Sequence, residues 1–332
     1  MISHAMAYTW GELSNADQSK YIGWQGAFYN IAKIVATGGL VYLAGILIEK
    51  STSQGDSLYD ANQHAWMIIM AILSAVMVLL GIYHIFMLPS GGKRAAVEVH
   101  RTGKQVMVEL GEVLIDFFRK RHIVYYICFI ILYRFAEGFV MKIVPLFLKT
   151  EREMGGLGLS EKEIGLYYGS YGAAAFVLGS LLAGYYISSR GLKKTLFTLC
   201  GIFNLPFLVY TLFAIFQPTN GLLICSGIIF EYFGYGFGFV GLTLFMMQQI
   251  APGKHQMAHY AFASGIMNLG VMIPGMLSGW VCELFEEWFN KPSGYEPFFI
   301  FVLIATIPAF LITYFVPFKY NQDGTLIEGE KG

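Results

Sequence analysis

The sequence predicts an all-α membrane protein, a polytopic bundle of about eight membrane-spanning helices. Composition is the first reason: 56% of the 332 residues are hydrophobic and 13% are charged, whereas soluble domains carry about 25% charged residues. The second reason is that the apolar residues gather into runs of about 20 residues, the length that a helix needs to cross a bilayer.

These runs follow a polar segment at residues 11–20, and turn-forming and charged residues separate them. Each run is long enough for one spanning helix. They lie at about 22–48, 65–88, 122–148, 164–187, 195–216, 221–247, 258–282 and 297–318.

The placement of lysine and arginine predicts the orientation of the spans, because cytoplasmic loops carry an excess of both. If the loops alternate, fourteen of the 22 basic residues fall on the side of Lys20, five fall on the other side and three lie within spans. We therefore expect the richer side, which includes the C-terminus, to be cytoplasmic.

The longest connection between spans suggests how the chain is divided. We expect two spans and part of a third in residues 1–89, a cytoplasmic linker at 90–121, six spans in 122–318 and a cytoplasmic tail at 319–332. Within the linker, Val97–Phe118 places apolar residues on one stripe and predicts an amphipathic helix on the membrane surface. This helix could be a passive strap or could bind a partner.

Several other functions find little support in the sequence. The formal net charge is zero, so nothing indicates binding to nucleic acid. The four cysteines lie in or beside apolar runs without C-x-x-C spacing, and His4, His84 and His259 lack metal-ligand spacing. No nucleophile is paired with a base. We therefore expect no enzyme activity, metal site or cofactor.

The stretch Tyr133–Pro145 carries charges inside the run at 122–148. Arg134 and Glu137 are three residues apart, so they share one face of a helix and can pair. Lys142 follows about two turns later, and we expect a kink or an end at Pro145. Ionisable residues at membrane depth are costly and usually face a bundle interior or a watery cavity.

Two other spans carry ionisable residues. The first places Tyr29, Asn30 and Lys33 on one polar stripe, which could offer a cation to an anionic substrate or could form a helix contact. Glu231 shares its helix face with four glycines, and these predict a tight helix–helix contact. Its carboxyl could be a proton site or a structural hydrogen-bonding group.

Two more spans have informative small or polar residues. The fourth is rich in glycine, alanine and serine from Gly165 to Ala183, which predicts close packing against a neighbour. The seventh combines Asn268 with Pro274, so we expect it to bend where a cavity is lined.

The loop after the fourth span, Gly184-Tyr-Tyr-Ile-Ser-Ser-Arg190-Gly191-Leu-Lys193-Lys194, resembles the loop signature G-x-x-x-D-[RK]-x-G-[RK]-[RK] of the major facilitator superfamily. Ser188 stands where that signature has its acid. The segments Phe28–Leu40 and Tyr133–Phe139 resemble the branch of this superfamily that contains muropeptide permeases and acetyl-CoA-transporter-related proteins.

The resemblance implies a twelve-span transporter. By that register the eight spans correspond to the fifth through twelfth, residues 1–9 to the end of the fourth, and the chain is expected to lack the first four. The resemblance also implies a bacterial inner (plasma) membrane location, a monomer, a gating loop at 184–194 and a central cavity lined by the helix of Arg134.

The resulting hypothesis is a secondary active transporter that works by alternating access. Its substrate would be a small anionic or amphipathic metabolite, such as a muropeptide-like solute, and its coupling ion a proton. Tyr29, Asn30, Lys33, Arg134, Glu137 and Asn268 are the candidate substrate contacts, and Glu137 and Glu231 the proton-linked candidates. A membrane sensor or scaffold, or a truncated transporter without function, is the alternative; no filter sequence indicates a channel.

Overall fold

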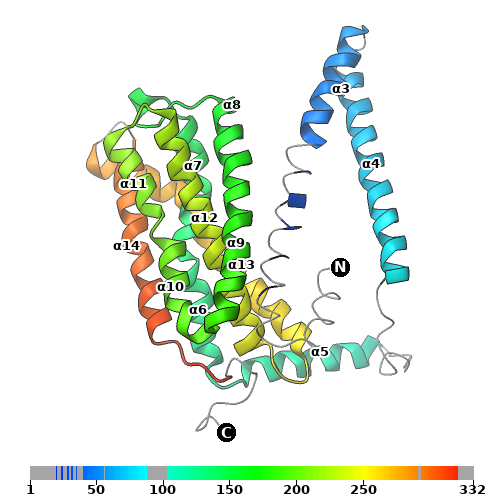
Figure 1. Cartoon of the computed structure of the whole chain (residues 1–332), viewed down its shortest axis with the longest axis vertical. Helices are drawn as coiled ribbons and strands as arrows, with labels where there is room; N and C mark the ends of the chain where they lie inside the picture. Colours follow the sequence, from blue (N-terminus) through cyan, green and yellow to red (C-terminus); the bar gives the residue numbers. More distant parts are fainter. Residues whose placement is uncertain are drawn as a thin grey trace. The chain divides into compact units, whose positions relative to one another are not determined.

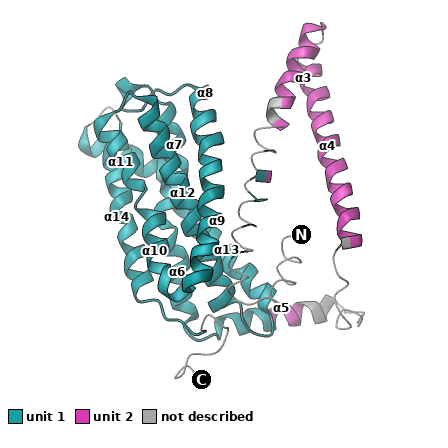
Figure 2. Cartoon of the chain, in the orientation of Figure 1, with its two compact units in different colours: residues 1–31, 112–332 teal, residues 32–111 magenta. Residues whose placement is uncertain are grey.

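The computed structural model describes residues 20, 24, 28–29, 31–32, 35, 40–55, 57–87, 103–290 and 293–320. The chain divides into two compact units, one of residues 32–111 and one of residues 1–31 and 112–332 (Figure 2). Helices form the described part of both units, which confirms the predicted all-α class.

The unit of residues 32–111 contains a helical hairpin. Its helices are α3 (Val41–Ser53) and α4 (Leu58–Met87), joined by a short turn (Figure 1). Gly55 lies in this turn with φ +99°, a conformation that glycine adopts without steric cost. Small side chains are buried along the hairpin, and most of the rest of α4 is apolar and exposed within the unit, as is typical of a membrane-spanning helix.

The unit of residues 1–31 and 112–332 contains a bundle of packed helices, seen around the labels α6 to α14 in Figure 1. α5 (Gly103–Phe118) leads into it from the other unit. The remaining elements are α6 (Ile123–Tyr133), α7 (Phe135–Lys149), η2 (Arg152–Met154), α8 (Glu161–Ile164), η3 (Gly165–Tyr171), α9 (Gly172–Arg190), α10 (Leu192–Asn204), α11 (Phe207–Phe216), α12 (Gly221–Phe245), η4 (Met246–Ile250), α13 (Gln256–Phe289) and α14 (Tyr295–Tyr314).

Six segments of the described chain are long and apolar enough to cross a membrane. They are Tyr59–Phe86, Gly165–Arg190, Leu192–Phe216, Gly221–Ile250, Gln256–Phe289 and Tyr295–Tyr314, and they match six of the predicted spans. Of the predicted span at 22–48, the structure describes residues 24, 28–29, 31–32, 35 and 40–48, and the last of these belong to α3. The one at 122–148 is present as two shorter helices, α6 and α7.

The break between α6 and α7 lies at a position that the sequence did not predict. We expected a kink or an end at Pro145, and the helix does not end there, because Pro145 lies inside α7, which continues to Lys149. The helix stops instead at Arg134, whose φ of −107° and ψ of 7° are not helical. At this residue the side chain reaches the bundle interior, so an internal charge interrupts the span.

Close crossings of the backbone hold α9 against α12. A Cβ added to Gly179 would lie 2.3 Å from the carbonyl oxygen of Phe233, and one added to Gly236 would lie 2.2 Å from that of Phe176. Glycine is therefore required on both sides of this contact. The small residues of the fourth span predicted such packing, although Gly165 and Gly169 have no neighbour within 4 Å at that position.

The end of α5 packs against the start of α13. Val113 and Phe117 are buried, whereas Leu110 and Leu114 of the predicted apolar stripe are exposed. The ring of His259 lies 5.7 Å from that of Phe117, and its Nε2 is 3.2 Å from the carbonyl oxygen of Val113. This confirms the interpretation of His259 as a packed, hydrogen-bonded histidine.

Lys120 joins two turns at this end of the bundle. Its Nζ donates to the carbonyl oxygens of Ile250, Ala251 and Pro252 at 2.5, 3.2 and 2.8 Å. The last carbonyl oxygens of a helix lack donors within the helix, because no further turn follows them. A lysine ammonium can supply three such donors. One side chain therefore ties the α5–α6 turn to the turn between η4 and α13.

Candidate functional site

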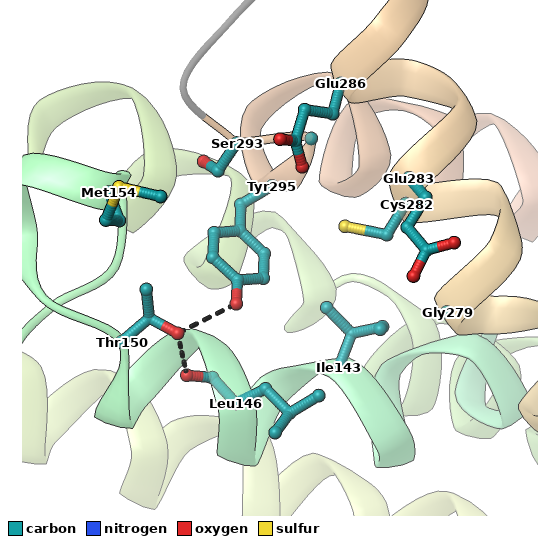
Figure 3. Close-up of a pocket in the computed structure, with 11 residues that line it drawn as sticks. Ile143, Leu146, Thr150, Met154, Gly279, Cys282, Glu283, Glu286, Ser293 and Tyr295 are labelled. Carbon is teal, nitrogen blue, oxygen red and sulfur yellow. Dashed lines mark hydrogen bonds between the residues drawn. The ribbon is translucent and has the colours of Figure 1, made fainter.

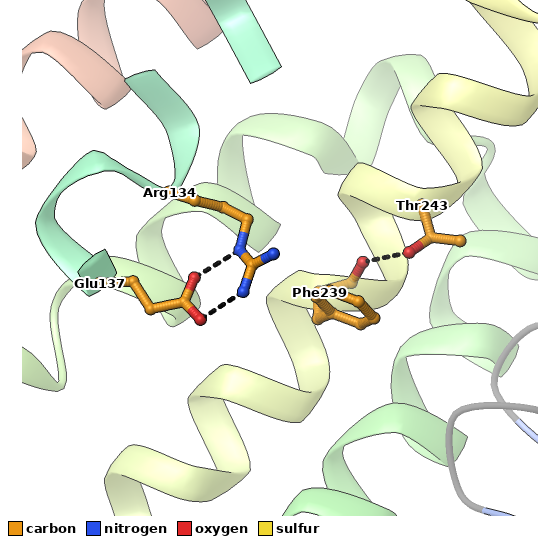
Figure 4. A network of polar contacts seen from close by, with 4 residues as sticks. All are labelled: Arg134, Glu137, Phe239 and Thr243. Carbon is orange, nitrogen blue, oxygen red and sulfur yellow. Dashed lines mark hydrogen bonds and ion pairs between the residues drawn. The ribbon is translucent and has the colours of Figure 1, made fainter. Parts of the chain in front are cut away.

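An ion pair lies inside the bundle at the α6–α7 break. Arg134 Nε donates to Glu137 Oε2 and Arg134 Nη2 to Glu137 Oε1, both at 2.5 Å, so the contact is bidentate (Figure 4). The side chains are only 6% and 4% exposed. The guanidinium also lies 5.3 Å from the ring centre of Phe239, which adds a cation–π contact. The predicted pairing is therefore confirmed.

The helix break helps to explain why a charged pair is stable there. Arg134 is the N-cap of α7, and Glu137 is the third residue of that helix. A carboxylate in the first turn of a helix is stabilised by the partial positive charge of the free N–H groups. A continuous helix would not offer these groups, so the interruption compensates part of the cost of burying Glu137.

Tyr133 and Tyr235 surround the pair from two helices. The hydroxyl of Tyr133 donates to the carbonyl oxygen of Gly238 at 3.1 Å, which fixes the end of α6 on α12. The phenol of Tyr235 interacts with both Arg134 and Glu137. The pair is thus enclosed by aromatic side chains of α12 and the preceding helix, and contact with bulk water is minimal.

Glu231 is the second buried acid, and α12 carries it. It is 8% exposed, and the hydroxyl of Tyr210 on α11 donates to its Oε2 at 3.1 Å. Among the described residues, no cation lies within ion-pair distance of it. An unpaired buried carboxylate is much more costly than a hydrogen-bonded neutral acid. Glu231 has a neutral hydroxyl as its partner, whereas Glu137 is paired with a guanidinium.

The glycines on the face of Glu231 pack as predicted. An added Cβ at Gly234 would lie 2.3 Å from the carbonyl oxygen of Ile202, and those at Gly238 and Gly241 would meet Phe203 and Leu199 of α10. At Gly227 an added Cβ would meet Val209 and Phe213 of α11. Glu231 therefore lies in a tight contact of α12 with both helices.

The other predicted substrate contacts are not gathered at the ion pair. Asn268 is exposed on α13, and Tyr29 is 59% exposed. Asn30 and Lys33 lie outside the described residues. The structure thus brings together Arg134 and Glu137 of the predicted set, with Glu231 in the same bundle.

The predicted gating segment forms a very short connection. α9 ends at Arg190, α10 begins at Leu192, and Gly191 between them has φ +81°. The guanidinium of Arg190 stacks 5.0 Å from the ring centre of Tyr186. Gly184 is buried, whereas Lys193 and Lys194 are exposed. The two lysines therefore form a basic surface at this end of the bundle.

Three aromatic residues of this region were not singled out by sequence reasoning. Tyr235 and Phe239 touch the ion pair, and Tyr210 bonds Glu231. Tyr235 and Phe239 lie four and eight residues after Glu231, a helical spacing that places them near its face. That spacing could have identified them, but nothing local could have identified Tyr210 on another helix.

A separate cavity of about 230 Å³ lies where the end of α7 meets the end of α13 and the start of α14 (Figure 3). Tyr295 and Thr150 share a hydrogen bond of 2.9 Å at its edge. Glu283 and Glu286 also line it, but both are exposed. None of the predicted site residues line this cavity.

Comparison with known proteins identifies the family. The sequence profile of the Major Facilitator Superfamily matches residues 1–252, which is more than half of the chain. The chain belongs to the major facilitator superfamily. It is therefore a multi-pass membrane protein of a superfamily of transporters, as the loop resemblance and the predicted spans indicated.

Curated relatives in this superfamily are similar over part of their length. The chain is 25% identical over 191 residues to "Putative transporter AmpG 1" of Rickettsia felis, covering 57% of this chain and 40% of the relative. It is 24% identical to the protein of that name in Rickettsia bellii, covering 60% and 45%. It is 22% identical to the "Anhydromuropeptide permease" of Escherichia coli K12, covering 59% and 37%. The chain thus matches less than half the length of these relatives.

Proposed function

We propose that this major facilitator protein acts in secondary active transport of a small anionic or amphipathic solute, coupled to protons. The observation that carries the proposal is the buried Arg134–Glu137 pair at a break in a spanning segment. Buried charges within membrane segments typically mark substrate or ion pathways, and broken helices recur at transporter binding sites. The names of the relatives favour a muropeptide-like solute.

In this proposal Arg134 binds the anionic group of the substrate. A guanidinium holds carboxylate and phosphate groups through two parallel hydrogen bonds, which is how it holds Glu137 now. A substrate anion would therefore compete with Glu137 for Arg134. Tyr29, Asn30, Lys33 and Asn268 are proposed as further contacts.

Proton coupling is assigned to Glu137 and Glu231. Glu137 would lose its counterion when substrate occupies Arg134, and a proton would then neutralise it. Glu231, with a neutral partner in Tyr210, can hold a proton without disturbing an ion pair. Both groups lie in the helix bundle of the unit of residues 1–31 and 112–332.

The remaining assignments also belong to the proposal. We propose a bacterial inner-membrane protein that acts as a monomer with its C-terminus in the cytoplasm, and a gate formed by Gly184, Arg190, Gly191, Lys193 and Lys194. We further propose the domain division at residues 89, 121 and 318. The exposed basic side chains after α9 support placing that connection on the cytoplasmic side.

The test is uptake of an anhydromuropeptide into proteoliposomes that contain the purified protein and carry an inward proton gradient. Wild-type protein should accumulate the solute, whereas Arg134→Gln should lose uptake and Glu137→Gln should lose the dependence on the gradient. Arg119→Gln is the matched control, because Arg119 is exposed at the end of α5. Uptake unchanged in both site variants would overturn the assignment.

A further inference from the structure

Four tyrosines, of which Tyr210 is buried and Tyr168, Tyr232 and Tyr235 are partly buried, link the two acidic positions of the bundle. Tyr210 from α11 donates to Glu231 at 3.1 Å. The rings of Tyr168 and Tyr232 are 4.8 Å apart, and those of Tyr232 and Tyr235 are 6.4 Å apart. Tyr235 then interacts with the Arg134–Glu137 pair.

Tyr235 has the most constrained position of the four. Its ring lies 4.9 Å from that of Phe176, 5.8 Å from that of Phe203 and 6.0 Å from that of Phe239. Aromatic neighbours on three helices therefore fix the ring, so its hydroxyl has a defined location. Phe239 also contacts the guanidinium of Arg134.

The charged and titratable groups around Tyr235 belong to one electrostatic unit. They are Arg134 and Glu137 at the α6–α7 break, and Glu231 on α12 itself. Glu231 in turn interacts with Glu137, Tyr210, Tyr168 and Tyr232. Two negative charges in one buried, low-dielectric region repel each other strongly. A change of charge at Glu137 therefore alters the electrostatic potential at Glu231.

A phenol suits the position between an ion pair and a second acid. Its hydroxyl both donates and accepts a hydrogen bond, whereas a carboxylate only accepts and a guanidinium only donates. It can thus donate to Glu137 when Arg134 is taken by a substrate anion, and it can accept from Arg134 when the anion has left. A phenylalanine of the same shape could do neither.

We propose that Tyr235 is a positioning residue that couples anion binding at Arg134 to proton binding at Glu137 and Glu231. It rests on the proposed transport function. When an anion displaces Glu137, the Tyr235 hydroxyl donates to the freed carboxylate until a proton neutralises it. Until then the negative charge of Glu137 favours retention of a proton on Glu231. When the anion leaves, Glu137 returns to Arg134 and the proton on Glu231 is released as the charge is again paired.

The test compares Tyr235→Phe with wild type in proteoliposomes, using an anhydromuropeptide. Exchange of labelled for unlabelled solute without a proton gradient should be retained. Accumulation driven by an inward gradient should fall about tenfold, the effect of losing one hydrogen bond to a charged group. Tyr125→Phe is the matched control, because it removes a part-buried phenol that bonds the carbonyl oxygen of Ile312, away from the charged groups.

The protonation of Glu231 can also be followed by infrared absorption, recorded with and without the solute. In purified wild type the carboxylic acid C=O band should change when the solute is added. Glu231→Gln should remove the band from both spectra, and Tyr235→Phe should leave it unchanged between the two.

The outcomes separate the inference from the function on which it rests. If Arg134→Gln transports as wild type does, the proposed function fails. If Arg134→Gln and Glu231→Gln are defective while Tyr235→Phe matches wild type in both accumulation and infrared response, the function stands and the role of Tyr235 is overturned.

Discussion

Arg134 and Glu137 depend on each other for burial. With side chains 6% and 4% exposed, either charge left alone would have to be desolvated without a counterion. A bidentate pair satisfies most of the donors and acceptors of both groups. Its desolvation nevertheless costs more free energy than burying an apolar pair of similar volume. The pair is therefore weak evidence for a stabilising role and better evidence for a functional one.

This reasoning predicts opposite effects of single and double substitutions. Arg134→Met alone and Glu137→Leu alone should each destabilise the protein by about 3–5 kcal/mol, because each leaves one buried charge without its partner. The double variant should recover most of that loss, since no charge is left. Thermal unfolding of the detergent-purified protein, followed by tryptophan fluorescence, measures both effects.

The double variant also separates stability from transport. It should be folded but inactive in the uptake assay, because no cation is left for the anion. A double variant as unstable as the single ones would show that the two side chains are held by contacts other than their mutual pairing.

At the scale of elements, the sequence predicted the helices better than their interruptions. Six runs of apolar residues became spans close to the predicted bounds, because a bilayer requires about 20 apolar residues whatever the neighbours are. The break at Arg134 was not predicted. The surroundings of its side chain are non-local, because the guanidinium lies over the ring of Phe239 on α12. The sequence predicted a kink or an end at Pro145, and the helix does not end there, because α7 continues past it.

The docking of the last turns of α5 should depend on pH through Lys120. Burial, with a smaller effect of the nearby Lys319, lowers the pKa of Lys120 from 10.5 to about 8. A released, hydrated Lys120 has the ordinary pKa, so between about pH 8 and 10.5 the undocked segment binds more protons than the docked one. The free energy of docking is therefore least favourable below pH 8. It becomes more favourable as the pH rises from about 8 to 10.5.

A nitroxide spin label at position 114, in an otherwise cysteine-free protein, measures this docking. The label should become less mobile between pH 7.5 and about pH 10, and Lys120→Met should remove that change. Lys254→Met is the matched control, because Lys254 is an exposed lysine at the same end of the bundle. A wild-type label whose mobility increases with pH would contradict the predicted direction.

At the scale of the whole molecule, the distribution of basic residues predicts the topology. The short connection at residues 189–194 should lie in the cytoplasm, and the segment around η2 at residues 152–154 should lie on the opposite side. Single cysteines at Ser189 and Glu153, both exposed, report this in intact cells. An impermeant maleimide should label only Glu153→Cys, and labelling of Ser189→Cys alone would invert the proposed orientation.

The sequence predicted only part of the candidate site. Arg134, Glu137 and Glu231 could be found because ionisable residues are conspicuous in apolar runs, and the pairing of the first two needed only their spacing. Their aromatic surroundings could not be found this way, because Tyr210 and Tyr168 reach Glu231 from other helices. Asn268, expected where the seventh span lines a cavity, is exposed on the surface of its unit.

The glycine crossing of α9 and α12 restricts how this bundle could move. Side-chain contacts can slip by changing rotamers, but a contact between two backbones, as at Gly179 and Gly236, has no such freedom. The two helices should therefore move as one rigid body during any change of conformation. Glu231 and Tyr235 are on α12, so both move with that rigid body. Arg134 and Glu137 belong to a different pair of helices. A relative movement of the two would therefore lengthen or shorten the contact on which the coupling depends.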